Sequence, residues 1–192
     1  MFRPQGQLPY HVARLEAGVF RRAYRALLPR VVRCTIAAPQ KLSFSVFSFS
    51  SERDGPEQVA SLRSFIRYAG QPVDFTIVSD GSHSYASRDL LRRVHPCVRV
   101  VAWRGVLRPD LPSYVHDYAE IHPMGKKLAV ELSLPIERPT IYADADVLFF
   151  PAARDLASLA SAGDGRGRYL LDCEAVYLDD RSFPAPARCP SR

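Results

Sequence analysis

The chain has no long apolar run and few cysteines, and each shortage removes a class of protein. No apolar stretch among the 192 residues approaches the ~18 needed to span a bilayer, so no integral membrane segment is predicted. The four cysteines form no C-x-x-C pair and no cluster with zinc-ligand spacing. No secretory signal is recognised, so we expect reduced thiols and a cytoplasmic protein.

Most of the chain carries no excess of positive charge. Residues 1–40 carry seven arginines and a single acid, Glu16. Subtracting these from the 26 basic and 20 acidic side chains of the whole chain leaves 19 of each sign in residues 41–192. The formal net charge of +6 therefore belongs to the N-terminal arm. Because the body is neutral, no nucleic-acid partner is predicted.

Residues 1–40 are expected to form a basic amphipathic helical arm followed by a linker. Apolar residues recur at helical spacing, with arginines between them, at Val12, Leu15, Val19, Ala23 and Leu27. Pro29 is expected to break the helix. The simplest interpretation is a helix packed on the body with its arginine face in solvent. Residues 10–33 could instead make a peripheral contact with an anionic membrane, or belong to an organellar transit segment.

Strands and helices alternate through the rest of the chain. Strands are expected at residues 42–49, 73–78, 98–103 and 140–147, and helices at 59–68, 85–94 and 114–134, the last restarting at Pro123. This alternation predicts an α/β domain over residues 41–178, with a Rossmann-like, largely parallel sheet flanked by helices. A short helix at 151–159, a strand at 169–172 and a loose proline-rich tail at 179–192 are also expected.

Two carboxylates, Asp144 and Asp146, interrupt the apolar run from Ile141 to Phe150. An ionised carboxylate is costly to bury unpaired, so such acids need a metal, a partner or an opening to water. In an extended chain residues i and i+2 share a face about 6–7 Å apart, so both could serve one cation. Ligand crevices of parallel sheets lie at the carboxyl ends of the strands, which would also bring Ser50 and Asp80 to this edge.

These blocks resemble a known enzyme superfamily. Gly125–Val130 followed by Pro139–Phe149 is similar to GT-A-type nucleotide-diphospho-sugar glycosyltransferases, in which a lysine-bearing helix precedes an apolar strand ending in Asp-x-Asp. Phe75–Ser82 resembles their second strand. The resemblance covers about residues 42–175. It implies a GT-A-like fold and a metal-dependent transferase that moves a sugar from a UDP- or GDP-sugar donor to an unknown acceptor.

The resemblance also implies roles for individual residues. A Mn²⁺ or Mg²⁺ ion would lie between the donor diphosphate and the two carboxylates, with Asp146 as its direct ligand. Asp144 would be a second ligand, or would meet the ribose or a metal-bound water. Asp80 is expected to contact the base or the ribose. Ser50, Ser51 and Arg53 would belong to the loop that cups the nucleotide.

Two further candidates, Lys126 and Lys127, could add positive charge beside the phosphates or pair with Asp80 or an acid of the motif. Consecutive helix positions point about 100° apart, so at most one should face the site. Solvated lysines remain an alternative. Asp80 could likewise be a turn residue before Gly81 that needs no ligand.

Three functions remain open. GT-A enzymes usually continue beyond Asp-x-Asp with an acceptor-binding half, whereas this chain ends at Arg192. We therefore expect either a glycosyltransferase, if the chain is complete, or a truncated or vestigial sugar-nucleotide-binding domain without transferase activity. The acidic pair also resembles the first motif of haloacid-dehalogenase-type phosphatases, whose first aspartate is the nucleophile. Such enzymes need a lysine downstream, and none follows Asp146.

Overall fold

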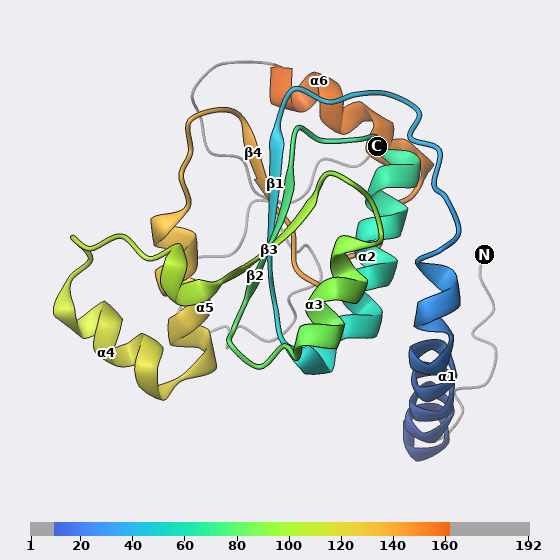
Figure 1. Cartoon of the computed structure of the whole chain (residues 1–192), viewed down its shortest axis with the longest axis horizontal. Helices are drawn as coiled ribbons and strands as arrows, with labels where there is room; N and C mark the ends of the chain where they lie inside the picture. Colours follow the sequence, from blue (N-terminus) through green and yellow to red (C-terminus); the bar gives the residue numbers. More distant parts are fainter. Residues whose placement is uncertain (1–9, 162–192) are drawn as a thin grey trace, which may run out of the picture. The chain divides into compact units, whose positions relative to one another are not determined.

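The computed structural model describes residues 10–161 of the chain. The chain divides into two compact units, Met1–Ala162 and Gly163–Arg192. The second lies outside the described residues, as do the strand predicted at 169–172 and the tail predicted at 179–192. The first unit has the predicted α/β, Rossmann-like fold, in which helices flank a four-stranded parallel sheet (Figure 1).

The sheet has the strand order β3-β2-β1-β4, and every neighbouring pair is parallel. Its strands are β1 (Ser45–Ser50), β2 (Phe75–Ser79), β3 (Val98–Ala102) and β4 (Thr140–Tyr142). From β1 the chain passes to β2 on one side, and after β3 it returns to β4 on the other side of β1. The carboxyl ends of β1 and β4 therefore flank a topological switch point, where open α/β sheets bind their ligands.

Helices cover both faces of this sheet (Figure 1). One face carries α2 (Gly55–Tyr68) and α3 (Tyr85–Arg92), and the other carries α4 (Ser113–Ile121) and α5 (Pro123–Ser133). Successive side chains of a strand point to opposite faces, so Val46 enters the core beneath α2 and Phe47 enters the core beneath α4 and α5. Shorter elements are η1 (Glu52–Asp54), η2 (Trp103–Gly105), η3 (Pro151–Asp155) and α6 (Leu156–Ser161).

The junction of α4 and α5 positions the lysine-bearing helix. A Cβ atom at Gly125 would lie 2.3 Å from the carbonyl oxygen of Tyr118, so only glycine allows this approach of the two helices. His122 ends α4 and caps α5, because its Nδ1 accepts a hydrogen bond from the Met124 amide at 3.1 Å. The predicted restart of the helix at Pro123 is confirmed.

The last strand is shorter than predicted. The strand expected to reach Val147 ends at Tyr142, because pairing with β1 covers only its first three residues. Asp144 and Asp146 follow in an irregular segment, and both are exposed to solvent. The apolar residues around them are not all buried, since Phe150 is 66% exposed. The prediction of carboxylates inside a buried apolar strand was therefore wrong.

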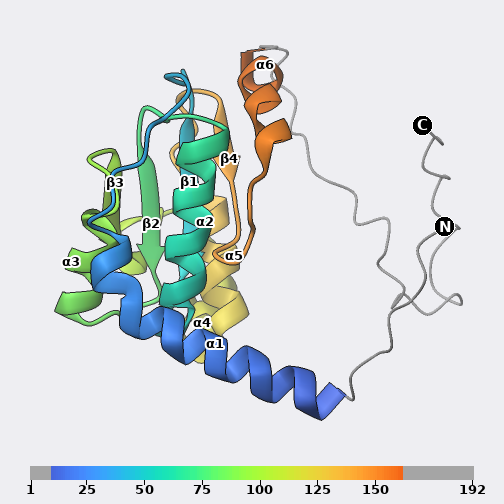
Figure 2. The same ribbon diagram turned by 90° about the vertical axis from the view of Figure 1, so that its right-hand side faces the viewer.

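Within the described residues the arm forms one helix, α1 (Tyr10–Val31), and Pro29 does not break it. Pro29 lies in the last turn, where its missing N–H removes only one hydrogen bond before the helix ends. Leu28 and Val32, at the end of α1 and just beyond it, are buried in the core shared with α2. Figure 2 shows α1 crossing close to the start of α2.

The packed face of α1 is not the predicted one. Arg21 and Arg25 point to the body, and their guanidinium groups donate to the carbonyl oxygen of Arg53 at 2.5 and 2.9 Å. Leu15 and Val19, from the predicted apolar stripe, are exposed instead. The arginines of α1 are therefore only partly solvated as expected: Arg21 and Arg25 bind oxygen acceptors on the body, whereas Arg22 and Arg30 are exposed to solvent.

Candidate functional site

A crevice of about 610 Å³ opens at the switch point, between the segments that follow β1 and β4. This volume falls within the usual range for small-molecule sites. Its lining combines Phe49, Pro123, Met124 and Ala145 with the charged residues Arg21, Arg53, Asp54, Glu57, Lys127, Asp144 and Asp146. Three of these side chains are cationic and four are carboxylates, so the formal charge of the lining is −1.

Asp144 and Lys127 meet inside this crevice. Lys127 extends from α5, and its Nζ donates to Asp144 Oδ1 at 2.6 Å. The same Nζ lies 5.5 Å from the centre of the Tyr142 ring, within cation–π range. Burial is the main cause that raises the pKa of the Tyr142 hydroxyl, and the carboxylates of Asp144 and Glu131 raise it further. Lys127 thus neutralises one of the two carboxylates of the predicted metal site.

The charged residues of the crevice differ in whether their side chains have partners in the described part of the chain. Arg21 and Glu57 form an ion pair, and the Asp54 carboxylate accepts hydrogen bonds from the loop that precedes it. Within residues 10–161, neither the Asp146 carboxylate nor the Arg53 guanidinium has a hydrogen-bond or ion-pair partner. The crevice therefore keeps one carboxylate and one guanidinium available for a ligand.

The loop after β2 is closed by its own hydrogen bonds. Asp80 Oδ1 accepts from the amide and the hydroxyl of Ser82, at 2.8 and 2.6 Å. Lys126 Nζ donates to the Asp80 carbonyl at 3.2 Å and lies 5.4 Å from the centre of the Trp103 ring. Neither Asp80 nor Lys126 lines the crevice. The two lysines point to different places, as their separation on the helix predicts.

Ser50 is buried beside this closed loop and does not line the crevice. Its Oγ lies 3.5 Å from Nε2 of His83, whose Nδ1 lies 2.9 Å from Ser79 Oγ. The Ser50 hydroxyl is thus turned into the protein and not toward a nucleotide. Burial lowers the pKa of His83, while the nearby carboxylates of Glu52 and Asp80 raise it.

Sequence reasoning missed part of the lining. Arg21 and Glu57 are 36 positions apart, and no local pattern joins them. One signal was available: Arg21, Arg25 and Leu28 share a helix face, which indicates that arginines can lie on the side that packs. His83 was also missed, although the serines around it offer many hydrogen-bond partners. Arg53 lies in η1, directly after β1, and lines the crevice.

The donor set of the crevice limits the kind of metal site that it can form. Within residues 10–161, no group of three or more His, Cys, Asp or Glu side chains is arranged to hold a metal ion. Mg²⁺ and similar hard cations are often bound by one or two carboxylates together with phosphate oxygens and water. Asp146, with Asp144 beside it, therefore fits a cation shared with a phosphate ligand. It does not fit a cation held by the protein alone.

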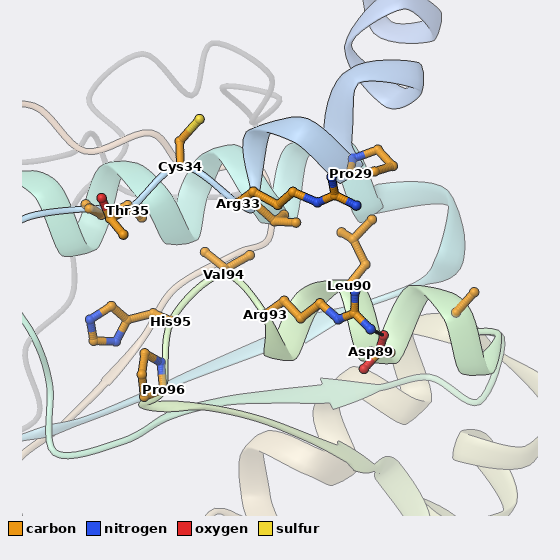
Figure 3. Close-up of a pocket in the computed structure, with 13 residues that line it drawn as sticks. Pro29, Arg33, Cys34, Thr35, Asp89, Leu90, Arg93, Val94, His95 and Pro96 are labelled. Carbon is orange, nitrogen blue, oxygen red and sulfur yellow. Dashed lines mark ion pairs between the residues drawn. The ribbon is translucent and has the colours of Figure 1, made fainter.

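A second cavity of about 590 Å³ lies between the end of α1 and α3 (Figure 3). In this view Leu90 lies between the side chains of Arg33 and Arg93, and Arg93 pairs with Asp89 at 2.6 Å. None of the residues predicted for the site lines this second cavity. The crevice at the switch point is therefore the candidate site.

Comparisons of the chain with protein families, with curated proteins and with solved structures find no match. Within the described part of the chain, no helix is long and apolar enough to cross a membrane. Fold and crevice together define an α/β protein with a charged crevice at the switch point of its sheet.

Proposed function

We propose that the chain binds a nucleotide-diphosphate sugar in the switch-point crevice, together with a divalent cation, and transfers the sugar to an acceptor. The observation that carries the proposal is the pair of Asp146 and Arg53, a carboxylate and a guanidinium of the same crevice that have no partner among residues 10–161. A metal–diphosphate unit needs both kinds of group, because it presents a cation and anionic oxygens together.

Charge favours a cation as part of the ligand. A diphosphate is strongly negative, and the lining already carries a formal charge of −1. Binding of the diphosphate alone would place like charges close together at a partly desolvated site. Asp146 would hold Mn²⁺ or Mg²⁺ jointly with the phosphates, and the bound cation would stabilise the departing diphosphate as a Lewis acid.

Two basic residues of the crevice, Arg53 and Lys127, have different roles in the proposed binding of the donor. Arg53 can donate two parallel N–H bonds to phosphate oxygens, which fixes orientation as well as charge. Lys127 holds Asp144 Oδ1 and leaves its second oxygen for a ribose hydroxyl or a metal-bound water. The start of α2 already carries Asp54 and Glu57. Phosphate is therefore expected at Arg53 and not at this helix terminus, where anions otherwise bind.

Calorimetric titration of the full chain with UDP and with GDP, each with and without Mn²⁺, tests the donor site. We expect binding of one nucleotide that depends on Mn²⁺. Asp146→Ala should abolish the metal dependence, and Arg53→Ala should weaken nucleotide binding about tenfold. Asp117→Ala, an exposed aspartate on α4 outside the crevice lining, is the matched control and should change nothing. Absence of metal-dependent binding to either nucleotide would refute the proposal.

Measuring the release of sugar from a UDP- or GDP-sugar distinguishes a transferase from a binding domain without activity. Metal-dependent binding with turnover of a UDP- or GDP-sugar supports a transferase, whereas binding without turnover supports a truncated or vestigial sugar-nucleotide-binding domain. Turnover of a generic phosphate ester that is lost in Asp144→Asn would instead support the phosphatase alternative.

We also propose a cytoplasmic location. Among residues 10–161, Cys34 and Cys97 form no disulfide with each other, and disulfides are rare in the cytoplasm. Burial raises the pKa of Cys97 to about 11, which keeps this thiol protonated and unreactive. Labelling of free thiols in protein taken directly from cells should find both cysteines reduced.

A further inference from the structure

Apolar side chains form a continuous row along the solvent side of α1. Leu15, Val19, Phe20 and Leu27 are 71%, 64%, 73% and 45% exposed. Positions 15, 19, 23 and 27 recur every four residues and share one helix face, and Phe20 lies beside them. We call Leu15, Val19, Phe20 and Leu27 the outer stripe. Single exposed apolar residues are ordinary, but a row along several turns marks an interaction surface.

The outward direction of the stripe is fixed by contacts on the other side of α1. Arg21 donates to both carboxylate oxygens of Glu57, and this hydrogen bond raises the pKa of the guanidinium. Arg21 and Arg25 also bind the Arg53 carbonyl, and Leu28 is buried in the core. These contacts set the rotation of the helix about its axis. The stripe cannot turn inward without breaking them.

Unpaired positive charge surrounds the stripe. Arg22 and Arg30 are exposed, and within the described residues neither side chain has an ion-pair partner. Glu16 is the single acid in the sequence of α1. An amphipathic helix with arginines and large apolar side chains is complementary to an anionic lipid surface. A second copy of this chain is a poorer occupant, because it would bring the same arginines together.

We propose that α1 docks the protein peripherally on an anionic membrane surface through the outer stripe, with Arg22 and Arg30 at the lipid headgroups. The inference does not depend on the proposed donor site. It has one consequence for that site: Arg21 lines the crevice and belongs to the same helix. Docking would therefore keep the crevice close to the membrane surface.

Co-sedimentation of the full chain with vesicles tests the proposal. We expect binding to phosphatidylcholine vesicles that contain phosphatidylserine, and little binding to phosphatidylcholine alone. Val19→Asp combined with Phe20→Asp should weaken binding at least about tenfold, since each side chain loses its burial in the acyl region. Ile121→Asp combined with Ile136→Asp changes equally exposed residues outside α1 and is the matched control. This control should bind as the unaltered chain does.

Two further measurements examine the parts of the proposal separately. Arg22→Gln and Arg30→Gln should each weaken vesicle binding about fivefold, and added salt should reduce the difference. Phe20→Trp places a fluorophore in the stripe, and its emission should shift to the blue when anionic vesicles are added. Trp103, the single natural tryptophan, is buried and supplies a constant background.

Several results would overturn the proposal. The full chain could fail to bind anionic vesicles, or bind neutral vesicles equally well. The Val19→Asp and Phe20→Asp variant could retain full binding while circular dichroism shows an intact fold. Concentration-dependent dimerisation in analytical ultracentrifugation, lost in that variant and accompanied by no vesicle binding, would assign the stripe to a second copy of the chain.

Discussion

The carboxyl edge of the sheet has two halves, which differ in whether their carboxylates accept hydrogen bonds from the protein itself. Beside β2, the Asp80 carboxylate and the Glu52 carboxylate are satisfied from within: Glu52 accepts from the Ser84 amide at 2.9 Å and from the Ser87 hydroxyl at 2.5 Å. Beside β4, Asp146 has no partner within residues 10–161. An acid at a strand end is therefore not a ligand site by position alone.

The difference follows from the donors that each loop carries. The segment after β2 contains Ser82, Ser84 and Ser87, whose hydroxyls and amides reach the nearby carboxylates. The segment after β4 contains alanines and apolar residues between its two acids and after them, and these side chains donate nothing. One half of the edge is thus closed by its own hydrogen bonds, and the other half stays available to a ligand.

The largest effect should come from Gly125→Ala, which tests how the open half is built. A Cβ atom 2.3 Å from the Tyr118 carbonyl oxygen forces α4 and α5 apart, and Lys127 moves with α5. We expect a loss of about 2 kcal/mol in the free energy of unfolding, measured by urea titration, because overpacking outweighs the gain in helix propensity. Gly105→Ala, with no atom within 4 Å of the new Cβ, should change little. Equal behaviour of the two variants would contradict the role given to Gly125.

Removing the imidazole that joins β1 and β2 should break the closed half. His83→Ala leaves the buried hydroxyls of Ser50 and Ser79 without this partner. We expect a loss of about 1–2 kcal/mol in the free energy of unfolding. Nucleotide binding in the open half should be unchanged. Weakened binding by a variant that remains folded would show that the two halves are coupled.

Acid should weaken the closed half through the same histidine. Burial holds the pKa of folded His83 below the ordinary value of 6.5, although Glu52 and Asp80 oppose this shift. The unfolded chain then binds the proton first, so stability is full above about pH 6.5 and is lost as the pH falls through the folded pKa. The urea midpoint should fall less with acid in His83→Gln than in the unaltered chain. Burial also lowers the pKa of His95, but that residue is common to both proteins and cancels in the difference.

The sheet could be predicted from the sequence because its strands are short apolar runs bounded by turn residues. The length of β4 could not, since β1 continues to Ser50 but the chain leaves its pairing with β1 after Tyr142, opposite Phe47. The rotation of α1 could not be read either. Helical spacing identifies an apolar face, but Arg21 and Arg25 face the body because Glu57 and the Arg53 carbonyl, both distant in sequence, accept their hydrogen bonds.

The lining of the crevice could be predicted only in part, because partners that are distant in sequence decide which side chains stay free. Strand alternation places the residues after β1 and β4 at one edge, and Arg53 and the Asp144–Asp146 pair line the same crevice there. Whether each side chain is then left free depends on neighbours that the pattern does not show. Ser50 and Asp80 occupy comparable strand ends, yet their polar atoms are taken up by His83 and Ser82.

The smallest effects should come from the adjacent lysines, which belong to opposite halves of the edge. The Lys127 side chain is 25% exposed and that of Asp144 is 49% exposed, so solvent screens the pair, and Lys127→Met should cost at most about 0.5 kcal/mol of stability. Lys127→Met also removes one positive charge from the crevice, which should weaken UDP or GDP binding at saturating Mn²⁺ about threefold. Lys126→Met removes a bond to the Asp80 carbonyl in the closed half and should leave nucleotide binding unchanged. Calorimetric titration of both variants compares two residues of the same type, on the same helix and one position apart. An equal loss in both would mean that the site spans the whole edge, and that the division between a closed and an open half is wrong.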